Sequence, residues 1–396
     1  MSFHKDFTLA MLGPVEIAQY LDLLDESMLP EIIPKGLGGS PVNLLCRELI
    51  SRGWQLLIVT VSPDVQDEVI LEGKNLKICV GPYTNKRARN LFSRERAYML
   101  KVLLREKPTI VHAHWTYEFA MVVQASGLPH VITAHDAPIS VLRLNFIPYR
   151  IVRTLMAYRV LSRAKRVVSV SPYVAKHLKR FMFYRGDGEV IPNGVPDYLF
   201  KCLNVDSPKH RPLTFATILN GWAGYKNGQV AIEAFARIRL ECQDVRLIMF
   251  GHGHGPGESA ENWAKKMGIT DGVEFIGYKP YKKLMDMVAQ EVDVLVHPSL
   301  EEAQSMVMTE VMAMGLPIIG GKYSGGVPWT LNQGRAGILV DVANTNEVAS
   351  AMLRLANNPE ERQKLGQLGR EFAESKFHIR IVADAYERVY QDLIAY

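Results

Sequence analysis

The stretch VDVLVHPSLEEAQSMVMTEVMAMGLPIIGG, residues 292–321, combines a strand, a helix and a second strand in one short segment. The apolar runs VDVLVHP and LPIIGG at its two ends lack polar alternation, which is typical of strands buried on both faces. Between them, we expect Ser305 to cap a helix that runs to Met314 and stops at Gly315. A strand, a helix and a strand in this order indicate parallel strands in an α/β sheet.

The same alternation of apolar strand and helical segment recurs along the chain, and it predicts two parallel sheets in tandem. The segment 192–212 separates the two series, because it is rich in Pro, Asn and Asp and lacks apolar periodicity. The fold class is therefore α/β, with two doubly wound Rossmann-like domains that face a central cleft, the usual ligand site of such folds. The expected strands are 7–12, 55–61, 76–80, 109–114, 130–135, 166–171 and 189–192 in the first half, and 213–219, 245–251, 273–277, 292–298, 316–321 and 336–340 in the second.

The length of 396 residues, with 48% hydrophobic and 22% charged side chains, is typical of a folded chain with two domains of ordinary size. We expect no signal peptide, and no apolar run reaches the roughly 20 residues of a membrane span. The cysteines are scattered, so we expect reduced thiols in a cytoplasmic protein. They are Cys46, Cys79, Cys202 and Cys242.

Positive charge is concentrated in the first half of the chain. Between residues 81 and 185 there are 19 Lys and Arg but 4 Asp and Glu, a net charge of +15. Such a region indicates an anionic partner, either a membrane surface, a phosphorylated lipid or a nucleic acid. A nucleic acid is the weakest of these, because no known binding module is present. The amphipathic stretch 86–108 fits either a helix at a membrane interface or a solvated helix packed on the sheet.

Glu302 and Glu310 stand in the opening stretch among mostly apolar residues. Glu302 follows a strand directly, so it is expected in a loop at the carboxyl end of that strand, facing the cleft. Glu310 lies on the helix, and no residue three or four positions away carries a positive charge that would neutralise it. Its carboxylate either accepts two hydroxyls of a ribose or is a solvated group at the edge of the helix.

The segment PKGLGGSPVNLLCREL (34–49) has the composition of a glycine loop that leads into a helix. Ser40 is expected as the N-cap and Pro41 as the first helical residue. Backbone amides at Gly38 and Gly39, in front of a helix N-terminus, are suited to binding phosphate. The alternative is that the glycines form no more than a turn.

Two further polar residues are expected at the ends of strands. His135, which precedes Asp136, either transfers a proton, donates to a substrate oxygen, or is a structural histidine. Lys226 lies in a glycine-bearing loop between a strand and a helix, where it either stabilises a leaving phosphate or is solvated. His252 and His254 alternate with glycines and have no third ligand at a usual spacing, so we expect a mobile loop and no metal site.

Taken together, these motifs resemble the retaining glycosyltransferases of family 4, which have the GT-B fold of two Rossmann-like domains. The resemblance covers nearly the whole chain, and its most specific motifs are the E-x7-E element and the junction IPNGV. The matching motifs, in chain order, are GLGG with the following helix and RGW (52–54), VHAHW (111–115), TAHD (133–136), VSVS (168–171), VIPNGV (190–195), KNG (226–228), VEFIGY (273–278), HPS-x-x-E-x7-E (297–310) with MAMGLPII, and GVPWTLNQGRAGILV (326–340).

The resemblance implies a role for each candidate residue. Glu310 would bind the ribose hydroxyls of the donor, and Glu302 would contact the donor sugar near the reacting carbon. Lys226 would hold the diphosphate, and His135 would lie beside the transferred sugar. The predicted catalytic residues are therefore Glu302, His135 and Lys226, and the predicted donor-binding residues are Glu310, Lys226, Gly38, Gly39, Ala303, Gln304, Ser305 and Met306.

The resemblance also implies domain boundaries and a chemistry. An acceptor-binding domain would span 1–200 and be completed by a final helix at 380–396, while a nucleotide-sugar-binding domain would span 205–379. Such enzymes take a nucleotide sugar, such as a UDP- or GDP-sugar, as substrate. They need neither a metal nor another cofactor, and they retain the anomeric configuration.

Three positions depart from the usual family pattern. Ala-Gln-Ser (303–305) stands where many members have Gly-Phe-Gly after the first glutamate, which alters the donor pocket. Asn220 stands where many members have an arginine six residues before the lysine, and Pro-Trp (328–329) replaces Pro-Glu. Because the two glutamates and the lysine are intact, we predict an active enzyme.

The predicted function is transfer of a hexose-type sugar to a lipid-linked or oligosaccharide acceptor in the biosynthesis of a surface polysaccharide such as lipopolysaccharide. The expected partners are the nucleotide-sugar donor, the glycan or lipid-linked acceptor and, through a peripheral contact, the anionic inner face of the cell membrane; no nucleic acid is expected. Two alternatives stay open: a nucleotide-sugar epimerase of similar fold, and a non-catalytic nucleotide-sugar-binding partner of another transferase.

Overall fold

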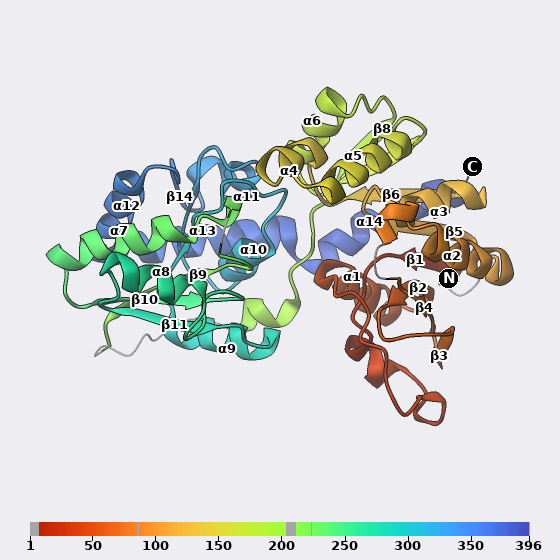
Figure 1. Ribbon diagram of the computed structural model, residues 1–396, viewed down its shortest axis with the longest axis horizontal. Helices are drawn as coiled ribbons and strands as arrows, with labels where there is room; N and C mark the ends of the chain where they lie inside the picture. Colours follow the sequence, from red (N-terminus) through yellow and green to blue (C-terminus); the bar gives the residue numbers. More distant parts are fainter. Residues whose placement is uncertain (1–7, 85–86, 203–210, 223, 396) are drawn as a thin grey trace. The chain divides into compact units, whose positions relative to one another are not determined.

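The computed structural model divides the chain into two compact units, each built on one sheet (Figure 1). The first unit contains residues 1–194 and 379–396, and the second contains the intervening residues. The structure describes residues 8–84, 87–202, 211–222 and 224–395.

The chain crosses between the units twice, at 194–195 and at 378–379, whereas the sequence placed these boundaries at 200–205 and 379–380. Of the expected linker, residues 203–210 lie outside the described part of the chain. The residues just before them form a short 3-10 helix, so the first part of this segment is regular structure.

The first unit contains an eight-stranded sheet with the strand order β3-β4-β2-β1-β5-β6-β7-β8. All neighbouring strands are parallel except β3 and β4. The strands are β1 (Thr8–Leu12), β2 (Gln55–Ser62), β3 (Val69–Gly73), β4 (Leu76–Pro82), β5 (Ile110–His114), β6 (His130–Ala134), β7 (Arg166–Ser169) and β8 (Asp187–Val190).

The edge strand β3 was missed by the sequence analysis, which expected no strand between 61 and 76. Its residues VILEG are mostly half-exposed, and they form an antiparallel hairpin with β4 in which Val69 pairs with Val80 and Gly73 with Leu76. An edge strand lacks the continuous apolar run of the buried parallel strands, so that pattern could not reveal it.

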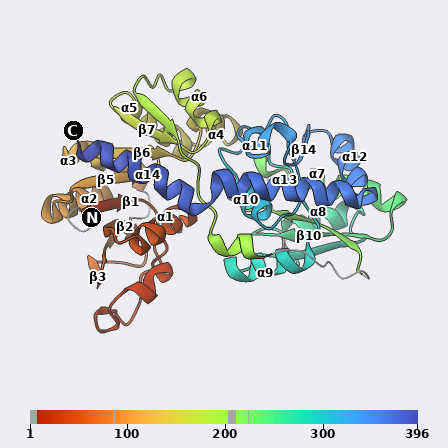
Figure 2. The ribbon, with the colours of Figure 1, turned by 180° about the vertical axis from the view of Figure 1, so that it is seen from behind.

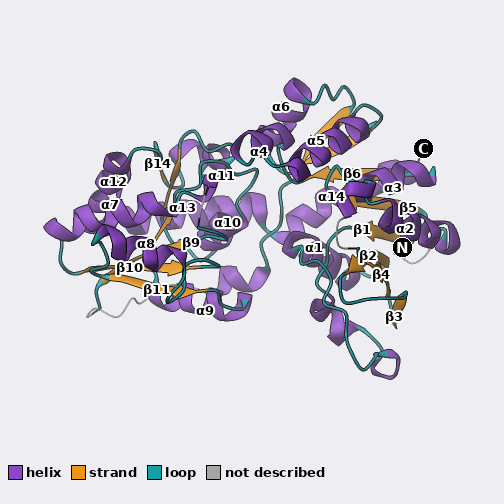
Figure 3. Ribbon diagram, viewed as in Figure 1, coloured by secondary structure: helices purple, strands orange, loops and turns teal. Residues whose placement is uncertain are grey.

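Helices cover both faces of this sheet, as Figure 3 shows by the purple helices around the orange strands. This arrangement confirms the doubly wound α/β prediction for the first half of the chain. The helices are η1 (Ile17–Leu23), η2 (Glu26–Met28), α1 (Ser40–Ser51), η3 (Arg87–Asn90), α2 (Ser93–Glu106), α3 (Glu118–Ser126), α4 (Pro138–Leu144), α5 (Pro148–Leu161), α6 (Pro172–Phe181) and α14 (Ile379–Ile394), where η marks a 3-10 helix.

The C-terminal helix α14 belongs to the first unit and packs on α1 and β5 (Figure 2). Tyr386 and Tyr390 on α14 are buried, and their hydroxyls reach polar side chains of the sheet. Tyr390 Oη lies 2.8 Å from His112 Nδ1, while Tyr386 Oη lies 3.0 Å from Thr133 Oγ1, which is 2.7 Å from His112 Nε2. These buried hydrogen bonds fix the last helix of the chain on the first sheet.

Helix α2 decides between the two interpretations of the basic stretch 86–108. Its apolar residues Met99, Val102 and Leu103 are buried, and the helix packs on α3 and β4. Its apolar face is therefore not available to a membrane, and the helix packed on the sheet is the correct interpretation. Within the described residues, no helix combines the length and the apolar character that crossing a membrane requires.

The second unit contains a six-stranded, fully parallel sheet with the order β11-β10-β9-β12-β13-β14. The strands are β9 (Leu213–Ile218), β10 (Val245–Phe250), β11 (Val273–Gly277), β12 (Val294–His297), β13 (Ile318–Gly321) and β14 (Ile338–Val340). The helices are η4 (Asp197–Lys201), η5 (Gly224–Lys226), α7 (Gly228–Glu241), α8 (Ser259–Met267), α9 (Tyr281–Glu291), α10 (Met306–Ala313), α11 (Val327–Thr330), η6 (Asn332–Gly334), α12 (Thr345–Asn357) and α13 (Pro359–Phe377).

Alternate residues of these strands enter different cores, because successive side chains point to opposite faces of a sheet. On β10, Ile248 and Phe250 pack in the cluster that includes α9, α10 and α13, while Leu247 and Met249 pack in the cluster with α7, α8 and α12. Both faces are thus covered, which explains why the predicted strands of this half are continuously apolar.

Helix α10 begins as the sequence predicted. The Ser305 hydroxyl accepts a hydrogen bond from the Met308 amide over 3.4 Å, which caps the helix. Gly315 follows the C-terminus with φ of +78°, a left-handed conformation that favours glycine. The helix therefore starts directly behind the loop that carries Glu302.

Candidate active site

The candidate residues of the second unit lie in loops that leave one edge of its sheet. Because all six strands are parallel, their carboxyl ends share an edge. Lys226 follows β9, Tyr281 follows β11, and Glu302 follows β12. This is the edge at which the sequence analysis expected the ligand.

The carboxylate of Glu302 holds two of these segments together. Glu302 Oε1 accepts from Lys226 Nζ over 2.7 Å and lies 3.1 Å from His297 Nε2 at the end of β12. Burial alone would raise the pKa of Glu302, but the hydrogen bond from His297 and the positive charge of Lys226 lower it to about 2. The carboxylate is therefore ionised at neutral pH, and Lys226 is not the solvated lysine of the alternative interpretation.

The residues after Lys226 explain the Lys-Asn-Gly motif in physical terms. Asn227 has φ of +56°, and its side-chain amide donates to the carbonyls of Pro298 over 3.2 Å and Val342 over 2.8 Å. Asparagine tolerates this left-handed conformation better than most residues. A Cβ at Gly228 would lie 3.0 Å from the ring of Trp222, so a larger residue would crowd it. The motif positions Lys226 without a covalent or metal constraint.

The loop that carries Glu302 is anchored at both ends by backbone hydrogen bonds. The Leu300 amide donates to Tyr225 O and the Gly326 amide donates to Glu302 O, both over 2.7 Å. A Cβ at Gly326 would lie 2.2 Å from Ala303 O, so this approach requires glycine. The predicted donor-binding residues Ala303, Gln304, Ser305 and Met306 continue this loop into the start of α10, and Gln304 and Ser305 are buried.

Glu310 is buried on α10 with 3% of its surface exposed, so the solvated alternative is wrong. Its Oε1 accepts from the hydroxyl of Tyr281 over 2.8 Å, and Tyr281 is in turn hydrogen-bonded to Tyr198. Burial raises the pKa of Glu310 to about 7, although the Tyr281 hydrogen bond opposes this shift. Tyr198 and Tyr281 are both exposed, so the hydroxyl that contacts the buried carboxyl belongs to a side chain that reaches the surface.

Tyr281 was missed by the sequence analysis. It is the first residue of α9, and it stands 29 positions before Glu310 in the chain. No sequence pattern around a tyrosine at the start of a helix identifies a hydrogen-bond partner so far along the chain. Its place at the carboxyl end of β11, the same edge as the other candidates, was the one available signal.

In the first unit, His135 follows β6 and takes part in a compact aromatic group. His135 Nε2 lies 2.9 Å from His114 Nδ1, and its ring stacks on Trp115 with the centroids 4.3 Å apart. Burial lowers the pKa of His135 to about 3, although a hydrogen bond with Asn193 opposes this shift. The imidazole is therefore neutral at pH 7, and its proposed roles in proton transfer and in hydrogen bonding to a substrate oxygen both stay predictions.

The glycine loop behind β1 differs in one detail from the prediction. The N-cap of α1 is Gly39, in a left-handed conformation with φ of +92°, and no side chain caps this helix. Ser40 is therefore the first helical residue rather than the N-cap, and Pro41 is the second. A Cβ at Gly39 would lie 2.0 Å from Pro14 O, whereas a Cβ at Gly38 would meet no atom within 4 Å. Gly39 is required by packing, and Gly38 is the glycine with open space beside it.

The paired histidines behind β10 have aromatic and backbone partners. His252 stacks on Tyr278 at a centroid distance of 4.4 Å, and His254 is fully buried with Nδ1 3.1 Å from the His252 carbonyl. The described residues contain no group of three or more His, Cys, Asp or Glu that could hold a metal ion.

We predict a strong coupling between Lys226 and Glu302, since both side chains are largely buried. A double-mutant cycle with Lys226→Met and Glu302→Gln, measured by urea unfolding at pH 7, should give a coupling energy of about 1–3 kcal/mol. The surface pair Lys322 and Glu347, whose side chains are more exposed, is the control and should give a clearly smaller coupling energy. Because the pKa of Glu302 is lowered, its contribution is complete above about pH 4.5 and is lost as the pH falls towards 2. Equal coupling in the two pairs would contradict this prediction.

We predict that Glu310→Gln stabilises the ligand-free protein. Because the pKa of Glu310 is about 7 in the folded protein, its carboxyl ionises more easily in the unfolded chain. The folded protein therefore loses stability as the pH rises above about 4.5, and this loss reaches its full size above about pH 7. The substitution should therefore raise the free energy of unfolding by about 3 kcal/mol at pH 8 and by about 1 kcal/mol at pH 5. Urea unfolding at both pH values measures this, with the exposed Glu374→Gln as the control. A destabilised Glu310→Gln at pH 8 would show that the carboxylate is structural.

Comparison with known proteins gives the same assignment for both halves of the chain. The sequence model described as Glycosyltransferase Family 4 matches residues 42–197, and that of Glycosyl transferases group 1 matches residues 215–372. An uncharacterized glycosyltransferase of Methanocaldococcus jannaschii is 24% identical over 92% of this chain and 98% of its own length. N-acetyl-alpha-D-glucosaminyl L-malate synthase of Bacillus anthracis is 29% identical, but the match covers 43% of each chain, less than half of that relative's length.

Solved structures of similar fold cover the whole chain. Sucrose-phosphate synthase from Thermosynechococcus elongatus has a TM-score of 0.79 at 20% identity, and the match covers 98% of this chain and 99% of that one. Anabaena HepE, solved in complex with UDP-glucose, has a TM-score of 0.68 at 15% identity, with 98% and 100% covered. At these identities the likeness shows the fold. The chain therefore belongs to the group 1 glycosyltransferases of family 4 and has their GT-B fold of two α/β units.

Proposed function

We propose that the chain transfers a hexose-type sugar, with retention of the anomeric configuration, from a nucleotide-diphosphate donor to a lipid-linked or oligosaccharide acceptor. The observation that carries this proposal is the Lys226–Glu302 pair at the carboxyl edge of the second sheet, 2.7 Å apart. A cation fixed in position at this edge is suited to stabilising a leaving diphosphate, because its orientation needs no rearrangement during the reaction.

The donor diphosphate would lie against Lys226 and the N-terminus of α10. Helix α10 begins at Met306, and the hydroxyl of Ser305 caps it by accepting from the Met308 amide. A helix N-terminus favours negative charge, and a lysine adds a point charge. Gly38, which has open space beside it, is the residue of the first unit that we assign to the same role. We propose that these groups act without a metal ion or another cofactor.

The proposed reaction is a front-face displacement. The bond between the anomeric carbon and the diphosphate oxygen breaks, and its electron pair leaves with the diphosphate. The acceptor oxygen bonds to the same face of the carbon, and its proton passes to the departing phosphate oxygen. Glu302 would contact the donor sugar and keep Lys226 in position, while neutral His135 would hydrogen-bond a sugar oxygen. Negative charge builds up on the leaving group, where Lys226 is placed to stabilise it.

The ribose of the donor would bind Glu310. A carboxylate accepts hydrogen bonds from two neighbouring hydroxyls, and such bonds favour its ionised form. Because the pKa of free Glu310 is about 7, donor binding at pH 7 would convert a half-protonated group into a carboxylate. The partly exposed Tyr281 would either share this carboxylate with the ribose or release it.

Two departures from the family pattern have structural counterparts that fit this proposal. Trp329 packs edge-to-face on Phe377 with the centroids 5.5 Å apart, so it contributes to the core of the second unit. The chain at Asn220 is followed by Gly221 with φ of +99°, a conformation that favours glycine. Lys226 is therefore the cation that we assign to the diphosphate, and the altered loop at 303–305 would contact the sugar mainly through its backbone.

We predict that a nucleotide-sugar donor stabilises the protein and releases protons on binding. UDP-glucose is the first compound to test, since HepE was solved with it, and GDP- and ADP-sugars complete the panel. At a concentration of about 100 Kd the donor should add about 2.7 kcal/mol to the free energy of unfolding. Calorimetry in buffers of different ionisation enthalpy at pH 7 should detect release of up to about half a proton. Glu310→Ala should abolish the stabilisation, and Glu310→Gln should abolish the proton release.

Three results would each contradict part of this proposal. Donor stabilisation unchanged in Glu310→Ala would remove the ribose from this site. Conversion of the donor into an altered sugar nucleotide without any added acceptor would favour the epimerase, whereas donor binding without turnover would favour the non-catalytic partner. The control variant is Glu374→Gln, whose carboxylate is exposed. A panel of lipid-linked and oligosaccharide acceptors with the stabilising donor then tests the transfer itself.

A further inference from the structure

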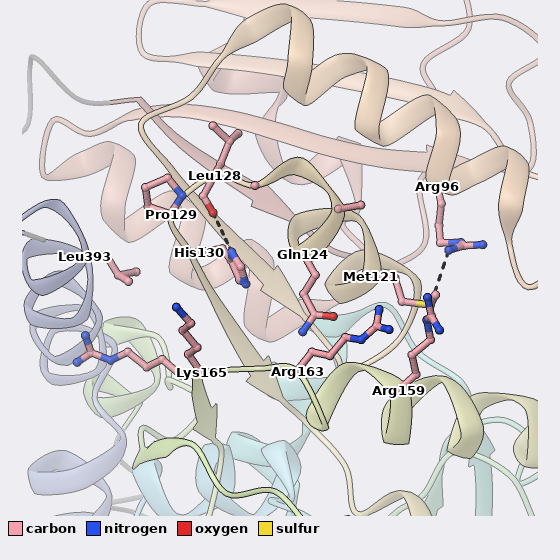
Figure 4. A pocket seen from close by; sticks show the side chains of 13 residues that line it. Arg96, Met121, Gln124, Leu128, Pro129, His130, Arg159, Arg163, Lys165 and Leu393 are labelled. Carbon is pink, nitrogen blue, oxygen red and sulfur yellow. Dashed lines mark hydrogen bonds between the residues drawn. The ribbon is translucent and has the colours of Figure 1, made fainter.

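A cavity of about 610 Å³ opens on the first unit at the edge of the sheet opposite to its candidate residues (Figure 4). It lies where the chain enters β6 and β7, so it is at the amino ends of these strands, whereas His135 follows the carboxyl end of β6. The lining residues come from α2, α3, the turn before β6, α5, the turn before β7 and α14. They are Arg96, Met121, Gln124, Ala125, Gly127, Leu128, Pro129, His130, Arg159, Arg163, Lys165, Arg166 and Leu393.

The lining of this cavity is strongly basic. It contains five Lys and Arg side chains and no Asp or Glu. Arg166 is neutralised, because its guanidinium pairs with Glu189 and, over 2.9 Å, with Asp392. Among the described residues, no carboxylate forms an ion pair with the other four cations, which are Arg96, Arg159, Arg163 and Lys165. The cavity therefore presents an uncompensated positive charge.

Arg96 shows that the clustering of positive charge in this cavity is unfavourable in the absence of an anion. Its Nη1 contacts the sulfur of Met121 at 3.9 Å, a weak acceptor, and its Nε is buried without a hydrogen-bond partner. Burial and the nearby charge of Arg159 lower the pKa of Arg96. Figure 4 shows Arg96 from α2 and Arg159 from α5 converging on Met121, with Arg163 on the same side of the cavity. Like charges that meet without a counter-ion are unfavourable unless an anion binds between them.

The exposed face of α5 continues from the cavity as a mixed apolar and basic surface. This surface is formed by Leu155, Tyr158 and Arg159 of α5 and by Ser162 and Arg163, which follow the helix directly, and all five are exposed. The Tyr158 ring packs edge-to-face on Phe183, which is 63% exposed, with the centroids 6.1 Å apart. Exposed aromatic and aliphatic side chains beside arginines are typical of surfaces that lie at a membrane interface.

We propose that this cavity is an anion site that binds the phosphate group of an anionic phospholipid, with the exposed side chains of Leu155, Tyr158 and Phe183 in contact with the lipid surface. Arginine guanidinium groups bind phosphate oxygens in a bidentate manner, which suits the convergence of Arg96, Arg159 and Arg163. This site is separate from the sugar-transfer residues, and it stands on its own observations whether or not the proposed function is correct. It assigns the membrane contact to α5, not to α2.

The test is binding of the full chain to vesicles. Wild-type protein should bind vesicles of phosphatidylcholine with phosphatidylglycerol, but not vesicles of phosphatidylcholine alone, in a flotation assay. Arg159→Glu with Arg163→Glu should lower the apparent affinity at least tenfold. Lys266→Glu with Lys364→Glu changes the net charge equally on exposed lysines of the second unit and should leave binding within about twofold. Higher salt should weaken wild-type binding, since the interaction is electrostatic.

A second arm distinguishes a lipid from a soluble phosphate compound. Tyr158→Ser with Phe183→Ser should weaken vesicle binding, yet leave thermal stabilisation by glycerol 3-phosphate unchanged, because the basic side chains stay in place. Vesicle binding that is equal in wild type and in Arg159→Glu with Arg163→Glu would overturn the proposal, as would an equal loss in the lysine control. Stabilisation by glycerol 3-phosphate without any vesicle binding would overturn the lipid assignment and leave a soluble phosphate ligand.

Discussion

The ionised carboxylate of Glu302 is the constraint on which the candidate active site of the second unit depends. It joins Lys226, from the loop after β9, to His297 at the end of β12, and these strands are neighbours in the sheet. Asn227 adds hydrogen bonds from the first of these loops to the exits of β12 and β14. A lysine on a glycine-rich loop would otherwise sample many rotamers, and its charge would help a leaving group less. The carboxylate therefore supplies preorganisation before any ligand arrives.

Glu302 and Glu310 have opposite effects on stability, and this difference separates their proposed roles. Glu302 is buried with a cation and a histidine, so its ionised form is favoured and contributes to folding. Glu310 is buried with one tyrosine hydroxyl, so its ionised form opposes folding near neutral pH. A carboxyl that costs stability in the free protein is poorly explained by packing, where Gln would serve better. Its burial is better explained by a ligand with hydroxyls to donate.

Much of the fold could be predicted from the sequence, because buried parallel strands have continuous apolar runs in their sequence. Thirteen of the fourteen strands in the described residues overlap an expected strand, although β8 is an exposed edge strand, and the half-exposed edge strand β3 was not expected. Individual site residues were also found, since strand ends can be read locally. Their partners were not, because Lys226 and Glu302 are 76 positions apart and Tyr281 and Glu310 are 29 apart. Spacing along the chain carries no signal for such pairs. The missing helix cap at Ser40 shows a similar limit, since Gly39 in a left-handed conformation ended the loop one residue earlier.

The first unit has two kinds of polar surface, one at the carboxyl ends of its parallel strands and one at their amino ends. At the carboxyl edge, His135 is half-buried, neutral and in contact with His114 and Trp115, which fits the proposed contact with an uncharged sugar hydroxyl. At the amino edge, arginines converge without carboxylates around an open cavity, which suits a mobile, charged headgroup. The amino and carboxyl ends of parallel strands lie at opposite edges of the sheet. An anion bound at the amino edge therefore leaves the carboxyl edge free. The basic composition of residues 81–185 thus need not describe the substrate of the reaction. A chain of this topology can be attracted to a surface by one edge and work at the other.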